Sequence, residues 1–401
     1  MRSLSIGLFR RRPGHHRVVI YCPDRHIVYD GRLPDRRGVG GGITARIRLA
    51  SALARRGHEV TVVCNCPRQQ RWKDVSYIPL DGVRRLDADV LILNTTGGAL
   101  DVRPALDLDL RAPFRMLWIG GITEPQGLRE VPFDILCAPS NFIRRVARDQ
   151  WAVPPAKLAV FHNGVEKALL RTPIRGRVAR QPHRLVYCGH PNKGLLGALG
   201  VLRLLRAHDP RFELHIYGGD GMYGGVDTPP AREAGTFYHG TVRQPALYRE
   251  LQRGSFALHL QDTPEAFGIA LAEAMAAGCI VLASAAGALP ELVRHGWNGF
   301  LVPGHYTEPP TWEYAAGLIL HLVRNESTAR YVRANACHSP FDWETVAATW
   351  EGYWTWALDG RPGLPPDHTW VMTACPECGS GRLALADGYH CLGCGLYGPA
   401  L

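Results

Sequence analysis

The chain has 401 residues, of which 46% are hydrophobic, and it carries a formal net charge of +10. This length and apolar content exclude a disordered polypeptide and allow two to three domains, each with its own core. Half of the excess charge comes from five arginines in residues 1–17, which we expect to form a flexible basic arm, so the charge does not indicate a broad basic binding face.

Strand-like and helix-like patterns alternate along residues 18–166. A buried strand, RVVIYCP, is followed by the helical segment GGITARIRLASALARRGH and by a second strand, EVTVVCN. The segments DVLILN, RMLWIG and DILCAPS continue the pattern, and a helix over residues 141–150 and the segment LAVFHNG complete it. Alternation of strands and helices is typical of a parallel sheet, so we expect a Rossmann-like N-terminal domain here.

A second domain of the same kind is predicted after a polar, arginine-rich connection at residues 167–183. Its strand-like segments, separated by helical patterns, are RLVYCGH, FELHIYGG, TFYHG, SFALHL and CIVLAS. We place this domain at residues 167–340 and a final helix within residues 341–360. The expected fold class is α/β, with two Rossmann-like, doubly wound domains followed by a small zinc ribbon at residues 365–401.

The segment EAFGIALAE carries two acids, Glu265 in the loop before a predicted helix and Glu273 inside that otherwise apolar helix. An ionised group costs several kcal/mol to bury without a partner, so Glu273 needs a group to bind, and a ribose diol would serve. Gly268 stands where the helix should begin, and the free amides of a helix N-terminus bind phosphate. The segment therefore predicts a nucleotide-binding site.

This segment resembles the donor-site motif of retaining glycosyltransferases of the family-4 type, which have the two-domain GT-B fold. The resemblance extends roughly from Val18 to Leu358 and includes RGHEVTVV, APSNFIRR, HNGVE, GHPNKGL and GALPELV. It implies transfer of a sugar, with retention, from a nucleoside-diphosphate sugar in the second domain to an unknown acceptor bound mainly by the first domain. That acceptor would be a glycan, a lipid-linked molecule or a small molecule.

The resemblance also assigns roles to individual residues. It implies that Glu265 contacts the donor sugar and helps the reaction centre, that Glu273 binds ribose hydroxyls, and that the final helix packs back on the first domain. An exposed loop acid and a buried, paired acid are the alternative interpretations of these two glutamates.

Lys193 is the leading candidate for neutralising the leaving diphosphate. It follows the strand RLVYCG, at the carboxyl edge of a parallel sheet, where ligands bind in such folds. The family usually places an arginine a few residues before this lysine, whereas His190 and Asn192 occupy that neighbourhood here. A solvated turn lysine is the alternative.

Backbone amides are expected to complete the donor site. Phe267, Gly268 and Ile269 would present theirs to the phosphates or the sugar, and glycine permits close approach. Gly41 and Gly42 precede the first helix and would line the cleft in the same way, although a flexible loop with a helix start explains them equally well. The complete predicted donor-binding set is Gly41, Gly42, Gly189, His190, Asn192, Phe267, Gly268, Ile269 and Glu273.

The first domain departs from many relatives near the reacting sugar. They place a histidine or an acid after a strand resembling RMLWIG, but this chain has Gly120, Gly121 and Glu124 there, and Glu124 is equally consistent with an exposed loop residue. The segment His162 to Gly164 resembles the family's loop at the entry to the interdomain hinge, and a turn that ends a strand also explains it. The resemblance suggests a front-face route in which the leaving phosphate helps to receive the acceptor proton.

Four cysteines near the C-terminus form the pattern CPEC, twelve residues, CLGC: Cys375, Cys378, Cys391 and Cys394. This spacing predicts a tetrahedral structural zinc with four thiolate ligands, and two disulfides or unligated thiols are the alternatives. A closed shell leaves no open position for a water, so no catalytic metal is expected. Residues 367–401 hold one arginine and three acids, so we expect contact with a protein or with the acceptor rather than with nucleic acid.

Two other functions stay open at this level. One is a catalytically degenerate nucleotide-sugar-binding protein that docks a partner through the zinc ribbon, and the other is a nucleotide-sugar epimerase, which shares the architecture. The sequence has no apolar run of about 18 residues that could span a bilayer, and the basic arm has no apolar run of secretory length. We therefore expect a cytoplasmic protein, with peripheral attachment to the inner face of a membrane as an alternative.

Overall fold

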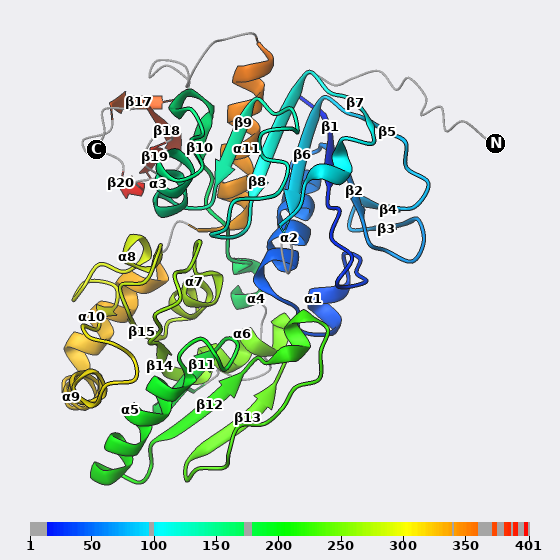
Figure 1. The fold of residues 1–401 in the computed structure, drawn as a ribbon. Helices are drawn as coiled ribbons and strands as arrows, with labels where there is room; N and C mark the ends of the chain where they lie inside the picture. The colour runs from blue at the N-terminus through cyan, green and yellow to red at the C-terminus, as the bar shows by residue number, and fades with distance from the viewer. Residues whose placement is uncertain are drawn as a thin grey trace.

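The computed structural model describes residues 14–95, 100–171, 179–338 and 341–359, together with the backbone of four short strands between residues 371 and 399 (Figure 1). Two parallel sheets dominate this part of the chain, one of eight strands and one of six. The expected α/β fold class is confirmed. We call residues 14–165 and 343–359 the first lobe and residues 181–338 the second lobe.

The first lobe is built on a sheet with the order β10-β9-β8-β6-β1-β2-β4-β3, in which β3 alone runs antiparallel to its neighbour. The strands are β1 (Arg17–Tyr21), β2 (Glu59–Cys64), β3 (Gln70–Trp72), β4 (Val75–Pro79), β6 (Val90–Thr95), β8 (Phe114–Ile119), β9 (Ile135–Ala138) and β10 (Leu158–Val160). A separate two-stranded sheet is formed by β5 (Arg85–Asp87) and β7 (Asp109–Arg111), and the helices are α1 (Leu33–Arg36), α2 (Gly41–Arg55) and α3 (Asn141–Asp149). The six strands predicted for this region are all present, whereas β3, β4, β5 and β7 lack the long apolar runs that would have indicated them.

The second lobe is built on a sheet with the order β13-β12-β11-β14-β15-β16, all of it parallel. Its strands are β11 (Gln181–Cys188), β12 (Glu213–Tyr217), β13 (Thr236–Gly240), β14 (Gly254–His259), β15 (Ile280–Ala283) and β16 (Phe300–Leu301). Its helices are α5 (Leu195–His208), α6 (Gln244–Arg253), α7 (Ile269–Ala276), α8 (Leu289–Leu292), α9 (Pro309–Arg324) and α10 (Glu326–Cys337), and α4 (Lys167–Arg171) precedes them. Separate apolar clusters cover the two faces of this sheet, one with α5 and α9 and the other with α6 and α7.

The chain passes between the lobes twice, and the last helix returns to the first lobe. α11 (Trp343–Leu358) packs against α2, and its side chains Trp343, Trp350 and Trp354 are fully buried in the core of the first lobe. The two passages lie side by side, because the Val165 N–H donates to the Phe341 carbonyl at 2.6 Å. We call these two passages, residues 165–166 and 341–342, the crossover.

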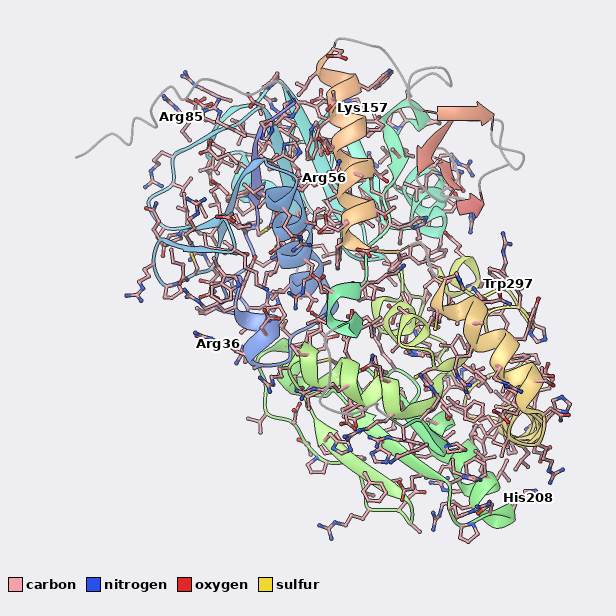
Figure 2. The ribbon with its side chains drawn as sticks, turned by 180° about the vertical axis from the view of Figure 1, so that it is seen from behind. Arg36, Arg56, Arg85, Lys157, His208 and Trp297 are labelled. Atoms are coloured by element: carbon pink, nitrogen blue, oxygen red, sulfur yellow. The ribbon has the colours of Figure 1, made fainter. Side chains whose placement is uncertain are left out.

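Helix α2 is enclosed by this arrangement. The sheet lies on one side of it and α11 on another, so that every residue from Ile43 to Ala54 is buried, including Arg46 and Arg48. Other charged and polar side chains lie at the periphery, as Arg85, Lys157 and His208 show in Figure 2. Two buried arginines inside one helix therefore require partners within the protein.

The C-terminal strands β17 (Val371–Ala374), β18 (Gly381–Leu385), β19 (Gly388–Cys391) and β20 (Tyr397–Pro399) form an antiparallel sheet in that order. Cys391 ends β19, and its side chain, like the whole of Cys375, Cys378 and Cys394, lies outside the described residues. The zinc site therefore stays a prediction. Elsewhere, in the part of the chain that is described, no group of three or more His, Cys, Asp or Glu side chains could hold a metal ion, and no helix is long and apolar enough to cross a membrane.

Candidate functional site

A cavity of about 370 Å³ lies between the two lobes, at the carboxyl ends of β6 and β8 in the first lobe and of β11 and β14 in the second. This is the edge at which parallel α/β sheets bind ligands. The first lobe contributes His26, Gly40, Gly41, Gly42, Ile43, Ala45, Asn94, Trp118, Gly120 and Asn163 to its lining. The second lobe contributes Tyr187, Cys188, Gly189, His190, Lys193, Met222, Tyr223, His259, Gln261, Leu289 and residues 265–271.

Lys193 and Glu265 form an ion pair on the wall of this cavity. The Lys193 Nζ donates to Glu265 Oε1 at 2.8 Å, and Gln261 Nε2 donates to the same oxygen at 3.3 Å. Burial lowers the pKa of Lys193, but the neighbouring Glu265 carboxylate outweighs it and the pKa is raised, so the ammonium stays charged at neutral pH. The predicted pair of catalytic candidates is thus brought together.

The backbone around Glu265 is fixed by a glycine of the segment GALPELV. The Ala288 N–H donates to the Glu265 carbonyl at 2.9 Å, and Gly287 forms a parallel bridge with Glu265. Gly287 has a φ of +62°, and a Cβ there would lie 2.5 Å from the Glu265 nitrogen. Only glycine allows this close approach without displacing the loop.

Two helices begin at the cavity. α7 starts after Gly268, whose φ of +101° and close neighbour Leu289 both favour glycine, and no side chain among the described residues caps this N-terminus. α2 starts after Gly40, again with no side-chain cap in the described part of the chain, and a Cβ at Gly41 would lie 3.2 Å from Ile269 Cδ1. The first amides of a helix have no intrahelical acceptor, so both ends present donors and a partial positive charge to the same space.

His190 and Asn192 occupy different places. His190 lines the cavity, and its Nε2 lies 3.0 Å from Asp220 Oδ1 while its Nδ1 accepts from the Asn192 N–H at 3.2 Å. Asn192 itself does not line the cavity. Glu124 is also absent from the lining, and its nearest cation is Arg129, with Nε 3.8 Å from Glu124 Oε1.

Glu273 lines a smaller adjoining cavity of about 110 Å³, which shares Gly41, Cys188, Gly189, Met222, Ile269 and Ala270 with the larger one. Its side chain is buried, and Oε1 accepts from Gln244 Nε2 at 2.6 Å and from the Tyr248 hydroxyl at 3.1 Å. Burial raises the pKa of Glu273 to about 6, although hydrogen bonds from Gln244 and Tyr248 and the charge of Arg48 act against this rise. A carboxylate of this kind is held ready to accept further hydrogen bonds at neutral pH.

Among the lining residues, His259 escaped the sequence interpretation, and Asn163 was marked only as part of the loop at the entry to the interdomain hinge. His259 ends β14, is buried, and its Nε2 has no hydrogen-bond partner among the described residues; burial lowers the pKa of this imidazole to about 4. Asn163 Oδ1 is likewise buried without a described partner. All six residues of β14 are buried, so no alternation along that strand could have shown that His259 faces a site.

A buried network supports the first-lobe side of the cavity. Arg46 Nη2 contacts Asp24 Oδ2 at 2.6 Å, Nη1 donates to the Tyr29 hydroxyl at 2.7 Å, and Nε donates to Asn94 Oδ1 at 2.7 Å. Asn94 in turn donates to the Trp118 carbonyl at 2.8 Å. Arg46 therefore holds two lining residues from behind rather than facing the cavity itself.

Comparison with known proteins finds similarity to glycosyltransferases over part of the chain. Residues 185–338 match the family model "Glycosyl transferases group 1". The chain is 30% identical over 210 residues to a D-inositol 3-phosphate glycosyltransferase of Mycobacterium ulcerans, covering 48% of this chain and 44% of the relative. It is 36% identical over 231 residues to a protein of the same description from Streptomyces scabiei, covering 51% and 50%. The chain thus spans about half the length of these curated relatives.

Solved structures share the fold. Sucrose-phosphate synthase from Thermosynechococcus elongatus aligns with a TM-score of 0.60 at 16% identity, over 86% of this chain and 100% of that structure. The Anabaena protein HepE in complex with UDP and glucose aligns with a TM-score of 0.57 at 17% identity, over the same shares of both chains. At such identities the likeness concerns the fold alone. The chain is thus similar to group 1 glycosyltransferases over residues 185–338, and its fold is similar to that of these two structures.

Proposed function

We propose that the chain transfers a sugar, with retention of the anomeric configuration, from a nucleoside-diphosphate sugar to an acceptor hydroxyl. The observation that carries this proposal is the Lys193–Glu265 ion pair, which lines an interlobe cavity together with the N-terminus of α7. A fixed cation and free amides are the groups that stabilise a departing diphosphate best.

The donor is placed along helix α7. Its diphosphate lies between Lys193 and the amides that follow Gly268, and its ribose hydroxyls donate to Glu273 from the smaller cavity. Glu273 lies five positions after Gly268 in the chain, which corresponds to a rise of about 7.5 Å along the helix. That distance suits phosphates and ribose hydroxyls of one nucleotide bound to the same helix.

The reaction follows from this placement. The bond between the anomeric carbon and the diphosphate oxygen breaks, and its electron pair remains on the phosphate, where Lys193 and the α7 amides stabilise the charge. The acceptor hydroxyl adds to the same face of the anomeric carbon and passes its proton to the leaving phosphate oxygen. Glu265 keeps Lys193 in place and accepts hydrogen bonds from the donor sugar.

The acceptor is assigned to the first-lobe side of the cavity, near Asn94, Trp118 and Gly120. Because the curated relatives are named as glycosyltransferases of D-inositol 3-phosphate, inositol phosphates are the first acceptors to test. Residues 18–166, with the helix at residues 341–360, would form the acceptor domain and residues 167–340 the donor domain. The glycosyltransferase descriptions of the relatives do not favour an epimerase.

The test is release of nucleoside diphosphate from a panel of UDP-, GDP- and ADP-sugars, with and without inositol phosphates, followed by NMR assignment of the product anomer. We expect one donor to release diphosphate and to give a product with the configuration of the donor. A chain whose melting temperature rises with nucleotide but that never releases diphosphate would be a binding protein, and an inverted product would exclude retention.

We also propose that Cys375, Cys378, Cys391 and Cys394 bind a structural zinc that folds residues 365–401. Cys378→Ser is expected to abolish bound zinc in metal analysis while donor binding changes little. The assignment would be contradicted if the unaltered chain contained no zinc. It would also be contradicted if Cys378→Ser contained as much zinc as the unaltered chain.

A further inference from the structure

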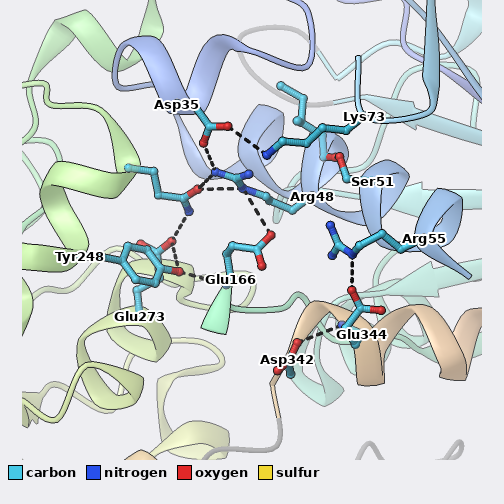
Figure 3. Close-up of polar contacts among 12 residues, drawn as sticks. Asp35, Arg48, Ser51, Arg55, Lys73, Glu166, Tyr248, Glu273, Asp342 and Glu344 are labelled. Carbon is cyan, nitrogen blue, oxygen red and sulfur yellow. Dashed lines mark hydrogen bonds and ion pairs between the residues drawn. The ribbon is translucent and has the colours of Figure 1, made fainter. Parts of the chain in front are cut away.

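The two lobes are connected behind the donor site by a buried ring of side chains, shown in Figure 3. We call it the Arg48 ring. It contains Arg48 of α2 in the first lobe, Glu166 of the crossover, Gln244 and Tyr248 of α6, and Glu273 of α7. All five residues are at least nine-tenths buried.

Arg48 is the centre of this ring. Its Nε and Nη2 both donate to Gln244 Oε1, at 2.9 and 2.6 Å, across the boundary between the lobes. Nη2 also donates to Asp35 Oδ1 at 2.6 Å, and Nε lies 3.9 Å from Glu166 Oε2. Lys73 holds the other side of the Asp35 carboxylate, with Nζ 3.3 Å from Oδ2.

Glu273 closes the ring from the second lobe. The amide nitrogen of Gln244 donates to Glu273 and its oxygen accepts from Arg48. Gln244 therefore connects Arg48 directly to Glu273. Tyr248 donates its hydroxyl proton to Glu273 and accepts from the Glu166 N–H at 3.1 Å. The donor-site carboxylate is therefore tied to the first lobe through Gln244 and to the crossover through Tyr248.

The chemistry of the ring requires an arginine. A planar guanidinium can bond Gln244 and Asp35 in fixed directions at once, whereas an ammonium is a single point charge. The positive charge also stands among the carboxylates of Asp35, Glu166 and Glu273, which are costly to bury without it. Loss of Arg48 would leave Gln244 free to turn away and Glu273 with one stabilising group fewer.

We propose that Arg48 is a positioning residue that couples nucleotide binding at Glu273 to the relative placement of the two lobes. This inference rests on the proposed function in one respect, namely that ribose hydroxyls bond Glu273. Nucleotide binding changes the hydrogen bonds of Glu273 and hence those of Gln244 and Tyr248, whose other partners, Arg48 and Glu166, lie outside the second lobe. Because coupling of two equilibria is reciprocal, a change in lobe placement must also change nucleotide affinity.

The test compares Arg48→Gln with Arg55→Gln, a matched control. Arg55 lies on the same helix, but its partner Glu344 belongs to α11, so that this ion pair stays inside the first lobe (Figure 3). Tyr248→Phe is a second ring variant that removes only a hydroxyl, and it keeps the test valid if Arg48→Gln does not fold. Affinity for UDP, GDP and ADP is measured by calorimetry, and the radius of gyration by small-angle X-ray scattering with and without nucleotide.

We expect Arg48→Gln to weaken binding of the preferred diphosphate about tenfold and Tyr248→Phe to weaken it less, within the usual range of coupling between sites. Both should reduce the change in radius that nucleotide causes in the unaltered chain, while Arg55→Gln changes neither quantity. Equal affinity and equal compaction in the ring variants and the control would overturn the coupling alone. An unaltered chain that binds none of the three diphosphates would overturn the proposed function and the coupling with it.

Discussion

Glu265 and Glu273 belong to one short segment, but they lie in different surroundings at the two ends of the site. Glu265 is partly exposed on the wall of the larger cavity and is paired directly with the Lys193 ammonium. Glu273 is buried in the smaller cavity, where its described partners are the neutral groups of Gln244 and Tyr248, and Arg48 acts on it only from beyond Gln244. The Glu265 carboxylate is thus neutralised by a full positive charge, whereas the Glu273 carboxylate is stabilised by hydrogen bonds from neutral groups.

This difference separates two tasks. At the Lys193 end, the ammonium can stabilise the negative charge that develops on the leaving group during bond cleavage. This is a kinetic role. At the Glu273 end, buried hydrogen bonds hold a carboxylate acceptor in a fixed position, and burial makes that carboxylate harder to ionise. This is a binding role. Variants at the two ends should therefore change different quantities.

The largest effect is expected from Lys193→Ala. Removal of the cation that faces the leaving diphosphate should lower turnover by about 10²–10³-fold, as found for single groups that stabilise a developing charge, with a much smaller change in donor affinity. Steady-state kinetics and calorimetry measure the two quantities separately. Lys157→Ala, on the periphery of the first lobe, is the control. If Lys193→Ala lost affinity and turnover to a similar degree, Lys193 would be assigned to donor binding instead.

At the other end, Glu273→Gln should weaken nucleoside diphosphate binding about tenfold, since a ribose hydroxyl then loses a charged acceptor. The same change should stabilise the fold at pH 7.5. The pKa of Glu273 is raised from 4.5 to about 6, so ionising this group opposes folding by an amount on the order of 2 kcal/mol.

The size of this stability effect depends on pH. A carboxyl whose pKa is raised in the folded state destabilises it fully above about pH 6, and the penalty disappears as the pH falls toward 4.5. Urea denaturation should therefore show Glu273→Gln more stable than the unaltered chain at pH 7.5 and equally stable near pH 4.5. A variant that is less stable at both values would show that the carboxylate serves the fold.

Nucleotide affinity should also follow the ionisation of Glu273. Between pH 7.5 and pH 5.5 we expect a several-fold loss of affinity in the unaltered chain and a flatter profile in Glu273→Gln, because protonation removes the charged acceptor. The phosphate groups of the ligand titrate in both proteins alike, so the difference between the two profiles isolates the residue. Parallel profiles would contradict the assigned role.

The smallest effect is expected from His259→Phe, near the Lys193 end. The Nε2 of this buried imidazole has no hydrogen-bond partner in the described part of the chain, so replacing the imidazole by a ring of similar size should raise the free energy of unfolding by about 1 kcal/mol. Turnover should fall a few-fold if the imidazole contacts the donor sugar. A stabilised protein with unchanged kinetics would make His259 a packing residue.

The sequence by itself determined the main elements and the donor segment. The buried strands of both sheets, the long helices α2 and α11, the helix start at Gly268 and the place of Lys193 after a strand all follow from apolar period, glycine position and local order. These features depend on residues that are close in the chain. The short strands β3, β4, β5, β7 and β16 were missed because none of them contains a long apolar run.

Only the tertiary structure decided which side chains meet. Arg48 and Gln244 are 196 positions apart, and nothing near either residue indicates the other. Asn192 stands next to Lys193 in the chain, but it does not line the cavity, whereas His259, which no motif marked, does. Local sequence sets where a strand or helix forms. The packing of the two lobes decides which buried polar groups become hydrogen-bond partners, because partnership depends on three-dimensional distances that the local sequence pattern does not contain.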